Sequence, residues 1–286
     1  MSEERHTIDI KNKLDHVTTG STEGGKCLNR HEPRKPNNSC SHIWQATKKA
    51  GSDSGLYNWP RYKDMPVVRQ VFFQGREADA GKPKQGDWDV KAGNFDTHCD
   101  VPYFHEAHHI IPNSTLSTTL ADYLGNPEEG GSPELVVVVR GGLLTAGYNL
   151  NHMDNMIMLP LDATVARVIG LPRHRTLPKM YHGVYSNHVK DELKSLLADN
   201  LEDLVDHEAP KYKDFKDKLI ALSKRLYGSI KQAGTDGVDA LDHMTKELFK
   251  PPANGCCAVG APWRKVDEVF SAVDDRRPQR SGPRPD

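Results

Sequence analysis

The sequence predicts an α+β fold: a small core of two short strands and a helix, additional C-terminal helices, and a largely irregular N-terminal region. Two short runs, HHIIP at 108–112 and MIMLP at 156–160, each end in a proline, as a short strand can. From Ser186 onward the apolar residues recur at helical spacing. Residues 1 to about 60 are rich in Gly, Ser, Asn, Lys and Pro, a composition that disfavours long packed elements.

Further elements follow from local patterns. We expect a short helix near 43–49 and a β-branched, aromatic strand at 66–73. Helical spacing over 116–124 stops at Gly125. The run LVVVV at 135–139 indicates a buried strand, although a short apolar run also fits a buried helix.

The C-terminal half is expected to be helical. Apolar residues share one helix face after Ser186 and again after Phe215, and a third helix is expected over 238–249. We therefore divide the chain into an accessory region (1–100), a core with its C-terminal helices (101–250) and a disordered tail (251–286).

The composition of the chain argues against several classes of protein. The 38 Lys and Arg balance the 39 Asp and Glu, so nucleic acid would have to bind a local patch rather than a globally basic surface. No apolar run is long enough to span a bilayer, and the N-terminus lacks the apolar stretch of a signal peptide. Five cysteines are an odd count, which argues against a disulfide scaffold.

Two adjacent histidines are the most informative feature. Side chains of successive strand residues point to opposite faces, so at a strand end one of His108 and His109 can bind a metal while the other reaches the substrate side. Asn155, on the second strand, can hold the loop by hydrogen bonds or offer its carbonyl oxygen to the ion, and His182 precedes the helix. Two strands, a helix and one cation form a ββα-metal site, which suits phosphodiester hydrolysis.

Three short blocks follow one another between residues 105 and 189. They are AHHIIP at 107–112, NMIMLP at 155–160, and HGVY at 182–185 with Val189 four residues after the tyrosine. In this order they resemble the AHH nucleases, a family of the HNH/endonuclease VII superfamily that includes bacterial polymorphic toxins.

The resemblance implies a role for each matched residue. His108 would be a metal ligand and His109 the general base, with Asn155 as the family's central asparagine and His182 as the ligand at the helix start. The cofactor would be one divalent ion, with magnesium favoured and zinc, manganese or nickel also suited to imidazole ligands.

The sequence departs from the family pattern at two positions. Met156 stands where the family usually has glycine, and Pro178 stands where it often has another histidine. The third ligand is therefore open, and His174 from the preceding loop, a water molecule or Asn155 could fill the place.

The resemblance also implies a biological role. It points to a metal-dependent endonuclease that acts on nucleic acid, with DNA favoured over RNA. Members are commonly toxins used between competing bacteria and neutralised by an immunity protein. The chain would then be made in the bacterial cytoplasm and delivered to another cell by a secretion system, without a cleavable signal peptide.

A second, structural zinc site is a weaker expectation. Its candidate ligands lie in or near the polar N-terminal region: Cys27, His31, Cys40, His42 and Cys99. Zinc needs about four such ligands, but these spacings are not standard, and free thiols are the alternative.

Two rival functions remain at this stage. The first is a zinc-stabilised binding module without catalysis, centred on the N-terminal cysteines and histidines. The second is an inactive, nuclease-like interaction domain, motivated by Met156 and Pro178.

Overall fold

The structure confirms the α+β fold, with helices arranged around a small antiparallel sheet. The computed structural model describes residues 16–17, 25–30, 35–57, 95, 103–176, 182–205 and 209–249. The strands in this part are β1 (His16–Val17), β2 (Lys26–Cys27), β3 (His105–His109) and β4 (Met156–Pro160). The α-helices are α2 (His42–Ser52), α3 (Asn113–Leu124), α4 (Pro133–Thr145), α5 (Ala163–Ile169), α6 (Gly183–Ala198), α7 (Leu201–Val205) and α8 (Ala209–Thr235).

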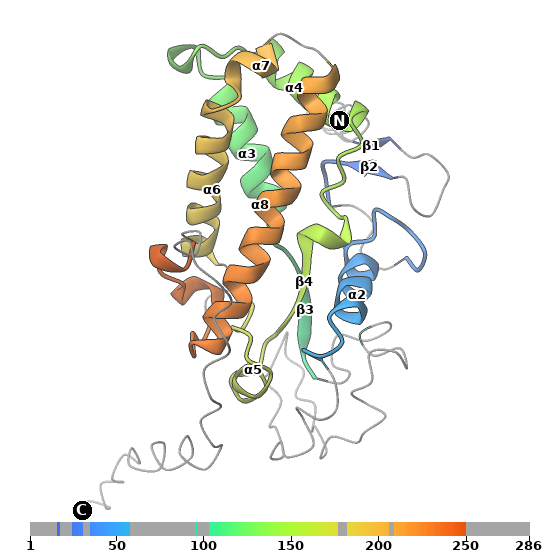
Figure 1. Ribbon diagram of the computed structural model, residues 1–286, viewed down its shortest axis with the longest axis vertical. Helices are drawn as coiled ribbons and strands as arrows, with labels where there is room; N and C mark the ends of the chain where they lie inside the picture. Colours follow the sequence, from blue (N-terminus) through green and yellow to red (C-terminus); the bar gives the residue numbers. More distant parts are fainter. Residues whose placement is uncertain are drawn as a thin grey trace, which may run out of the picture. The chain divides into compact units, whose positions relative to one another are not determined.

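Strands β3 and β4 form the antiparallel ribbon that carries the site. His105 pairs with Pro160 and His109 with Met156, so the histidine end of β3 meets the start of β4. All five residues of β4 are buried. Helix α2 packs on both strands and lies beside them in Figure 1. This packing explains why β4 is apolar throughout rather than alternating.

Helices build the rest of the core. Helix α3 packs against α6, and α4 packs against the long helix α8. The α4–α8 contact is close because Gly142 has no side chain: a Cβ atom there would lie 2.5 Å from the Tyr212 ring. Along α8, Leu219, Leu226 and Ile230 recur at helical spacing and are fully buried.

The expected strand at 135–139 is wrong, because these residues lie within α4. Ser132 caps this helix by accepting a hydrogen bond from the backbone of Leu135, and Pro133 occupies its first turn. The apolar character continues to Leu143 and Leu144, which gives the segment the length of a helix.

Other boundaries differ in smaller ways. The helices near 43–49 and over 116–124 and the strand at 156–160 are confirmed. The first strand covers 105–109 instead of 108–112, since Ile110 and Ile111 bond to the loop residue Asn155. In place of a helix over 238–249 there are two 3-10 turns, Leu241–His243 and Lys246–Phe249.

Some expectations fall outside the described residues. These are the strand at 66–73, the tail 251–286, and the zinc candidates His31 and Cys99. Among the helices that are described, none combines the length and the apolar character needed to cross a membrane.

Candidate metal centre

Three histidines meet beside the β3–β4 ribbon. His108 comes from β3, His174 from the loop after α5, and His182 from the residue that precedes α6. One ring nitrogen from each lies within 4.8 Å of the others. The ring centroids are 4.8 Å apart for His108–His174 and for His108–His182, and 5.1 Å apart for His174–His182. Of the third-ligand candidates, the structure brings His174 into the cluster.

Glu106 orients His174. Successive strand residues alternate, so Glu106 and His108 share a face of β3. The Nδ1 atom of His174 lies 2.5 Å from Oε2 of Glu106, while Arg175 bonds the other carboxylate oxygen. A carboxylate on one ring nitrogen turns the other toward a metal. The Nε2 atom of His174 accordingly faces His108 Nδ1 at 3.1 Å.

The first turn of α6 fixes His182. Its Nδ1 atom lies 3.1 Å from the Ser186 hydroxyl one helical turn later. The backbone amide of Val184 donates at 2.7 Å to the carboxylate of Asp242, which lies in the 3-10 turn Leu241–His243. This carboxylate satisfies an amide that would otherwise be unpaired at the helix start.

Two rings of the cluster, those of His108 and His182, are held in the neutral form. Burial, together with the neighbouring His174 and His182, holds the pKa of His108 well below its ordinary value. Burial and His174 lower the pKa of His182 to about 4. Both rings are therefore unprotonated at neutral pH and keep lone pairs for a metal. For Glu106, burial alone would raise the pKa, but the bonds to His174 and Arg175 outweigh it, so the carboxylate stays charged.

His109 lies on the opposite face of β3, outside the three-histidine cluster. Its Nε2 atom is 2.8 Å from Oδ1 of Asn151, and its ring stacks on His42 with centroids 5.4 Å apart. Burial lowers the pKa of His109 to about 4, although the bond to Asn151 works in the other direction. The ring is thus neutral at pH 7, as an acceptor of protons must be.

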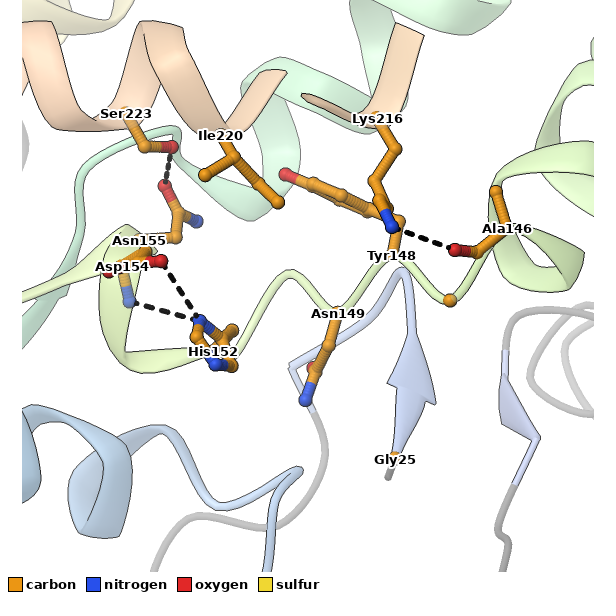
Figure 2. A pocket seen from close by; sticks show the side chains of 11 residues that line it. Gly25, Ala146, Tyr148, Asn149, His152, Asp154, Asn155, Lys216, Ile220 and Ser223 are labelled. Atoms are coloured by element: carbon orange, nitrogen blue, oxygen red, sulfur yellow. Dashed lines mark hydrogen bonds and ion pairs between the residues drawn. The ribbon is translucent and has the colours of Figure 1, made fainter. Parts of the chain in front are cut away.

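Asn155 holds the loop by hydrogen bonds, which is the first of the two roles that the sequence allowed for this residue. Its Oδ1 accepts from the Ile111 amide at 2.7 Å and from Ser223 of α8 at 2.9 Å, and its Nδ2 donates to the carbonyls of Ile111 and Leu150. Figure 2 shows the bond between Asn155 and Ser223. These four bonds use both ends of the amide.

The described N-terminal residues do not gather into a zinc site. Cys27, Cys40 and His42 are buried, but the three-histidine group is the one metal-ligating cluster found among the described residues. The thiol of Cys27 instead donates to the Asn29 carbonyl at 2.9 Å.

Two site residues were missed or undecided from the sequence. For Glu106 the sequence left two interpretations open, a partner that orients an imidazole or a solvent-facing residue, and the structure shows it bonded to His174 from the same strand face as His108. Asn151 carried no such signal, because its partners His109 and Asn29 are 42 and 122 residues away.

Comparison with known proteins relates one segment of the chain to a known family. Residues 92–219 match the family model of AHH, a nuclease family of the HNH/ENDO VII superfamily with a conserved AHH. This segment is therefore similar to the AHH nucleases. The match contains the whole histidine cluster together with Asn151, and it confirms the resemblance drawn from the three sequence blocks. Searches of the curated proteins and of the solved structures found no significant match.

Similarity to the AHH family implies a class of chemistry. Its nucleases hydrolyse phosphodiester bonds, so nucleic acid is the substrate class that the family implies. Nucleases of the HNH/ENDO VII superfamily depend on a metal ion, and the three-histidine cluster is the place in the described structure where one fits.

Proposed function

We propose that the chain is a metal-dependent endonuclease whose single ion is held by His108, His174 and His182. The convergence of these three rings carries the proposal. A supporting observation is the Nε2 atom of His108, which is buried and has no hydrogen-bond partner within the described part of the chain. Leaving a buried polar group unpaired costs about 1–3 kcal/mol of folding free energy. An ion bound by these rings would offset this cost.

The donor set favours a transition ion. Three imidazoles suit zinc, nickel or manganese, whereas magnesium prefers oxygen ligands. We therefore place zinc, nickel and manganese ahead of the magnesium favoured by the sequence. When bound, such an ion polarises a phosphate oxygen and stabilises negative charge on the leaving oxygen.

The chain's own residues would supply the rest of the chemistry. His109 would take the proton of the attacking water, since its neutral ring can accept one. Glu106 would hold His174 in place, and Ser186 would do the same for His182. Asn155 would hold the segment between β3 and α3, which directly follows the strand that carries His108 and His109.

Cleavage by the purified full chain tests this function. Supercoiled plasmid and single-stranded RNA would each be incubated with metal-stripped protein, and with protein given magnesium, manganese, nickel or zinc. We expect cleavage that needs a transition ion and favours DNA. His109→Ala should lower the rate by about 10²–10⁴-fold, the usual contribution of general base catalysis. His188→Ala is the matched control, because His188 packs on Phe249 instead of joining the cluster.

Two results would contradict the proposal. One is cleavage that survives complete removal of metal, and the other is equal activity in His109→Ala and the unaltered chain. A folded chain that binds nucleic acid without cutting it would favour the inactive, nuclease-like alternative. The zinc-stabilised binding module has no support among the described N-terminal residues.

We further propose that the nuclease is an antibacterial toxin, delivered to another cell and neutralised in its producer by an immunity protein. This proposal rests on the family resemblance alone. Expression of the chain inside bacteria should then stop growth, and His109→Ala should relieve the effect. Growth arrest of equal strength with His109→Ala would show that toxicity, if present, does not come from this site.

A further inference from the structure

The orientation of the Asn151 side chain is fixed by its neighbours. Its Nδ2 donates to the Asn29 carbonyl at 2.9 Å, and a carbonyl can only accept. The nitrogen end of the amide therefore points at Asn29 and the oxygen end at His109. Asn151 is fully buried, and its backbone amide donates to Oδ1 of Asn149 at 3.0 Å, so the residue is held at both the main chain and the side chain.

This orientation dictates where the proton of His109 lies. Oδ1 of Asn151 can only accept, so Nε2 of His109, at 2.8 Å, must be the donor. A neutral imidazole carries one ring proton, which leaves Nδ1 with the free lone pair. The stacked ring of His42, inclined by 27° to that of His109, restricts rotation of the imidazole.

The N-terminal segment holds this arrangement in place. The backbone of Cys27 in β2 makes two hydrogen bonds to the chain before Asn151, to the Tyr148 carbonyl at 3.0 Å and from the Leu150 amide at 2.7 Å. Asn149 donates to the Ser39 carbonyl at 2.8 Å; Figure 2 shows Asn149 on this loop, alongside the end of β2. Residues far apart in sequence thus determine the position of one amide.

We infer that Asn151 is a positioning residue that fixes His109 in the Nε2–H tautomer, so that Nδ1 is the atom that accepts a proton from water. The catalytic half of this inference rests on the proposed function, in which His109 is the base. The inference also gives the N-terminal residues 25–30 and 35–42 a role: they complete the active site by holding the Asn149–Asn151 loop and by supplying the stacked ring of His42.

Two substitutions separate positioning from simple structural support. Asn151→Leu removes both the acceptor for His109 and the donor to Asn29. Asn151→Asp keeps an acceptor oxygen for His109 and loses the donor to Asn29. Asn149→Leu is the matched control, because Asn149 supports the same loop by hydrogen bonds to Ser39 and Asn151.

Nitrogen-15 NMR of the imidazoles in the full chain measures the tautomer directly, without reference to activity. We expect His109 in the Nε2–H form in the unaltered chain, in Asn151→Asp and in Asn149→Leu, with a mixture or the Nδ1–H form in Asn151→Leu. The kcat for nucleic acid should fall by about 10²-fold in Asn151→Leu, the usual cost of misplacing a catalytic group, with KM and metal affinity unchanged and with recovery in Asn151→Asp.

The NMR spectra test the tautomer of His109 whether or not the chain cleaves nucleic acid. An Nδ1–H tautomer in the unaltered chain overturns it even if Asn151→Leu does not fold. An unchanged tautomer in folded Asn151→Leu overturns it as well. A chain that shows the Asn151-dependent tautomer but never cleaves nucleic acid would overturn the proposed function and leave the tautomer assignment standing.

Discussion

His174 and Glu106 form a histidine–carboxylate pair, with Nδ1 of the ring 2.5 Å from Oε2 of the carboxylate. The pair links the loop after α5 to β3 across 68 residues. The backbone amide of His174 also donates to the carbonyl of Pro160 at the end of β4, at 2.9 Å. Side chain and main chain together therefore hold His174 beside His108 and His182.

Glu106→Gln tests this pair. The substitution keeps the shape of the side chain and removes its charge, so His174 loses the charged acceptor that directs its Nε2 toward the cluster. An amide oxygen can still accept from the ring, but more weakly than a carboxylate, so we expect zinc affinity to fall by about 10–100-fold, as for other carboxylates behind a metal-binding histidine, with the fold retained in circular dichroism. Glu192→Gln is the control, because Glu192 pairs with Arg225 away from the cluster. Equal zinc affinity in Glu106→Gln and the unaltered chain would refute the role of Glu106.

Asn155→Ala should destabilise the protein without a specific effect on metal binding. The substitution leaves the buried partners of four hydrogen bonds unpaired, and we expect a loss of about 2–5 kcal/mol in the free energy of unfolding. Urea denaturation measures this loss. Ser223→Ala removes only one of the bonds and should cost about 1 kcal/mol. A stable Asn155→Ala variant with weakened metal affinity would instead point to Asn155 as a ligand.

The adjacent glycines of α4 should respond in opposite ways to alanine. Gly141 has open space where a Cβ atom would lie, so Gly141→Ala should stabilise the helix by about 0.5–1 kcal/mol. At Gly142 the new Cβ would lie 2.5 Å from the Tyr212 ring, so Gly142→Ala should destabilise by about 1–3 kcal/mol. Thermal unfolding of the two variants compares them. Equal effects of the two substitutions would mean that α4 and α8 are not in close contact at this point.

Asp53 makes the stability of the folded protein depend on pH under acidic conditions. It accepts hydrogen bonds from Tyr227 at 2.7 Å and Lys231 at 2.6 Å, which tie the end of α2 to α8. Burial alone would raise the pKa of Asp53, but the bonds from Lys231 and Tyr227 outweigh it and hold the pKa below its ordinary value of 3.8. A lowered pKa means that the folded state favours the charged carboxylate, so this stabilisation is present above pH 3.8 and is lost as the pH falls through the folded-state pKa.

Asp53→Asn should therefore destabilise the protein by about 1 kcal/mol at pH 7, and the difference from the unaltered chain should shrink below pH 4. Urea unfolding at pH 7, 5 and 3 measures both effects. Asp236→Asn is the control, since Asp236 is bonded to Gln232 on an exposed surface at the end of α8. A difference that stays constant down to pH 3 would contradict the assignment.

The sequence predicted the parts of the site that depend on local pattern. His108 and His109 could be placed on a strand and His182 at a helix start, because spacing and proline signals are local. His174 was one of three candidates for the third ligand, and only the fold shows that the loop after α5 returns to the end of β4.

The parts that were missed depend on contacts between distant segments. Asn151 acts through Asn29 and His109, and no short-range pattern relates these residues. The strand expected at 135–139 failed for a different reason. A short apolar run is consistent with both strand and helix, and a serine followed by a proline, as at 132–133, is found both in turns and at helix starts.

Zinc titration of the metal-free chain tests the central claim most directly. The unaltered chain should bind one zinc ion tightly, His174→Ala should lose most of that affinity, and His188→Ala should bind like the unaltered chain. The three-histidine site would be contradicted by unchanged binding in folded His174→Ala, or by the absence of stoichiometric binding of any divalent transition ion to the unaltered chain.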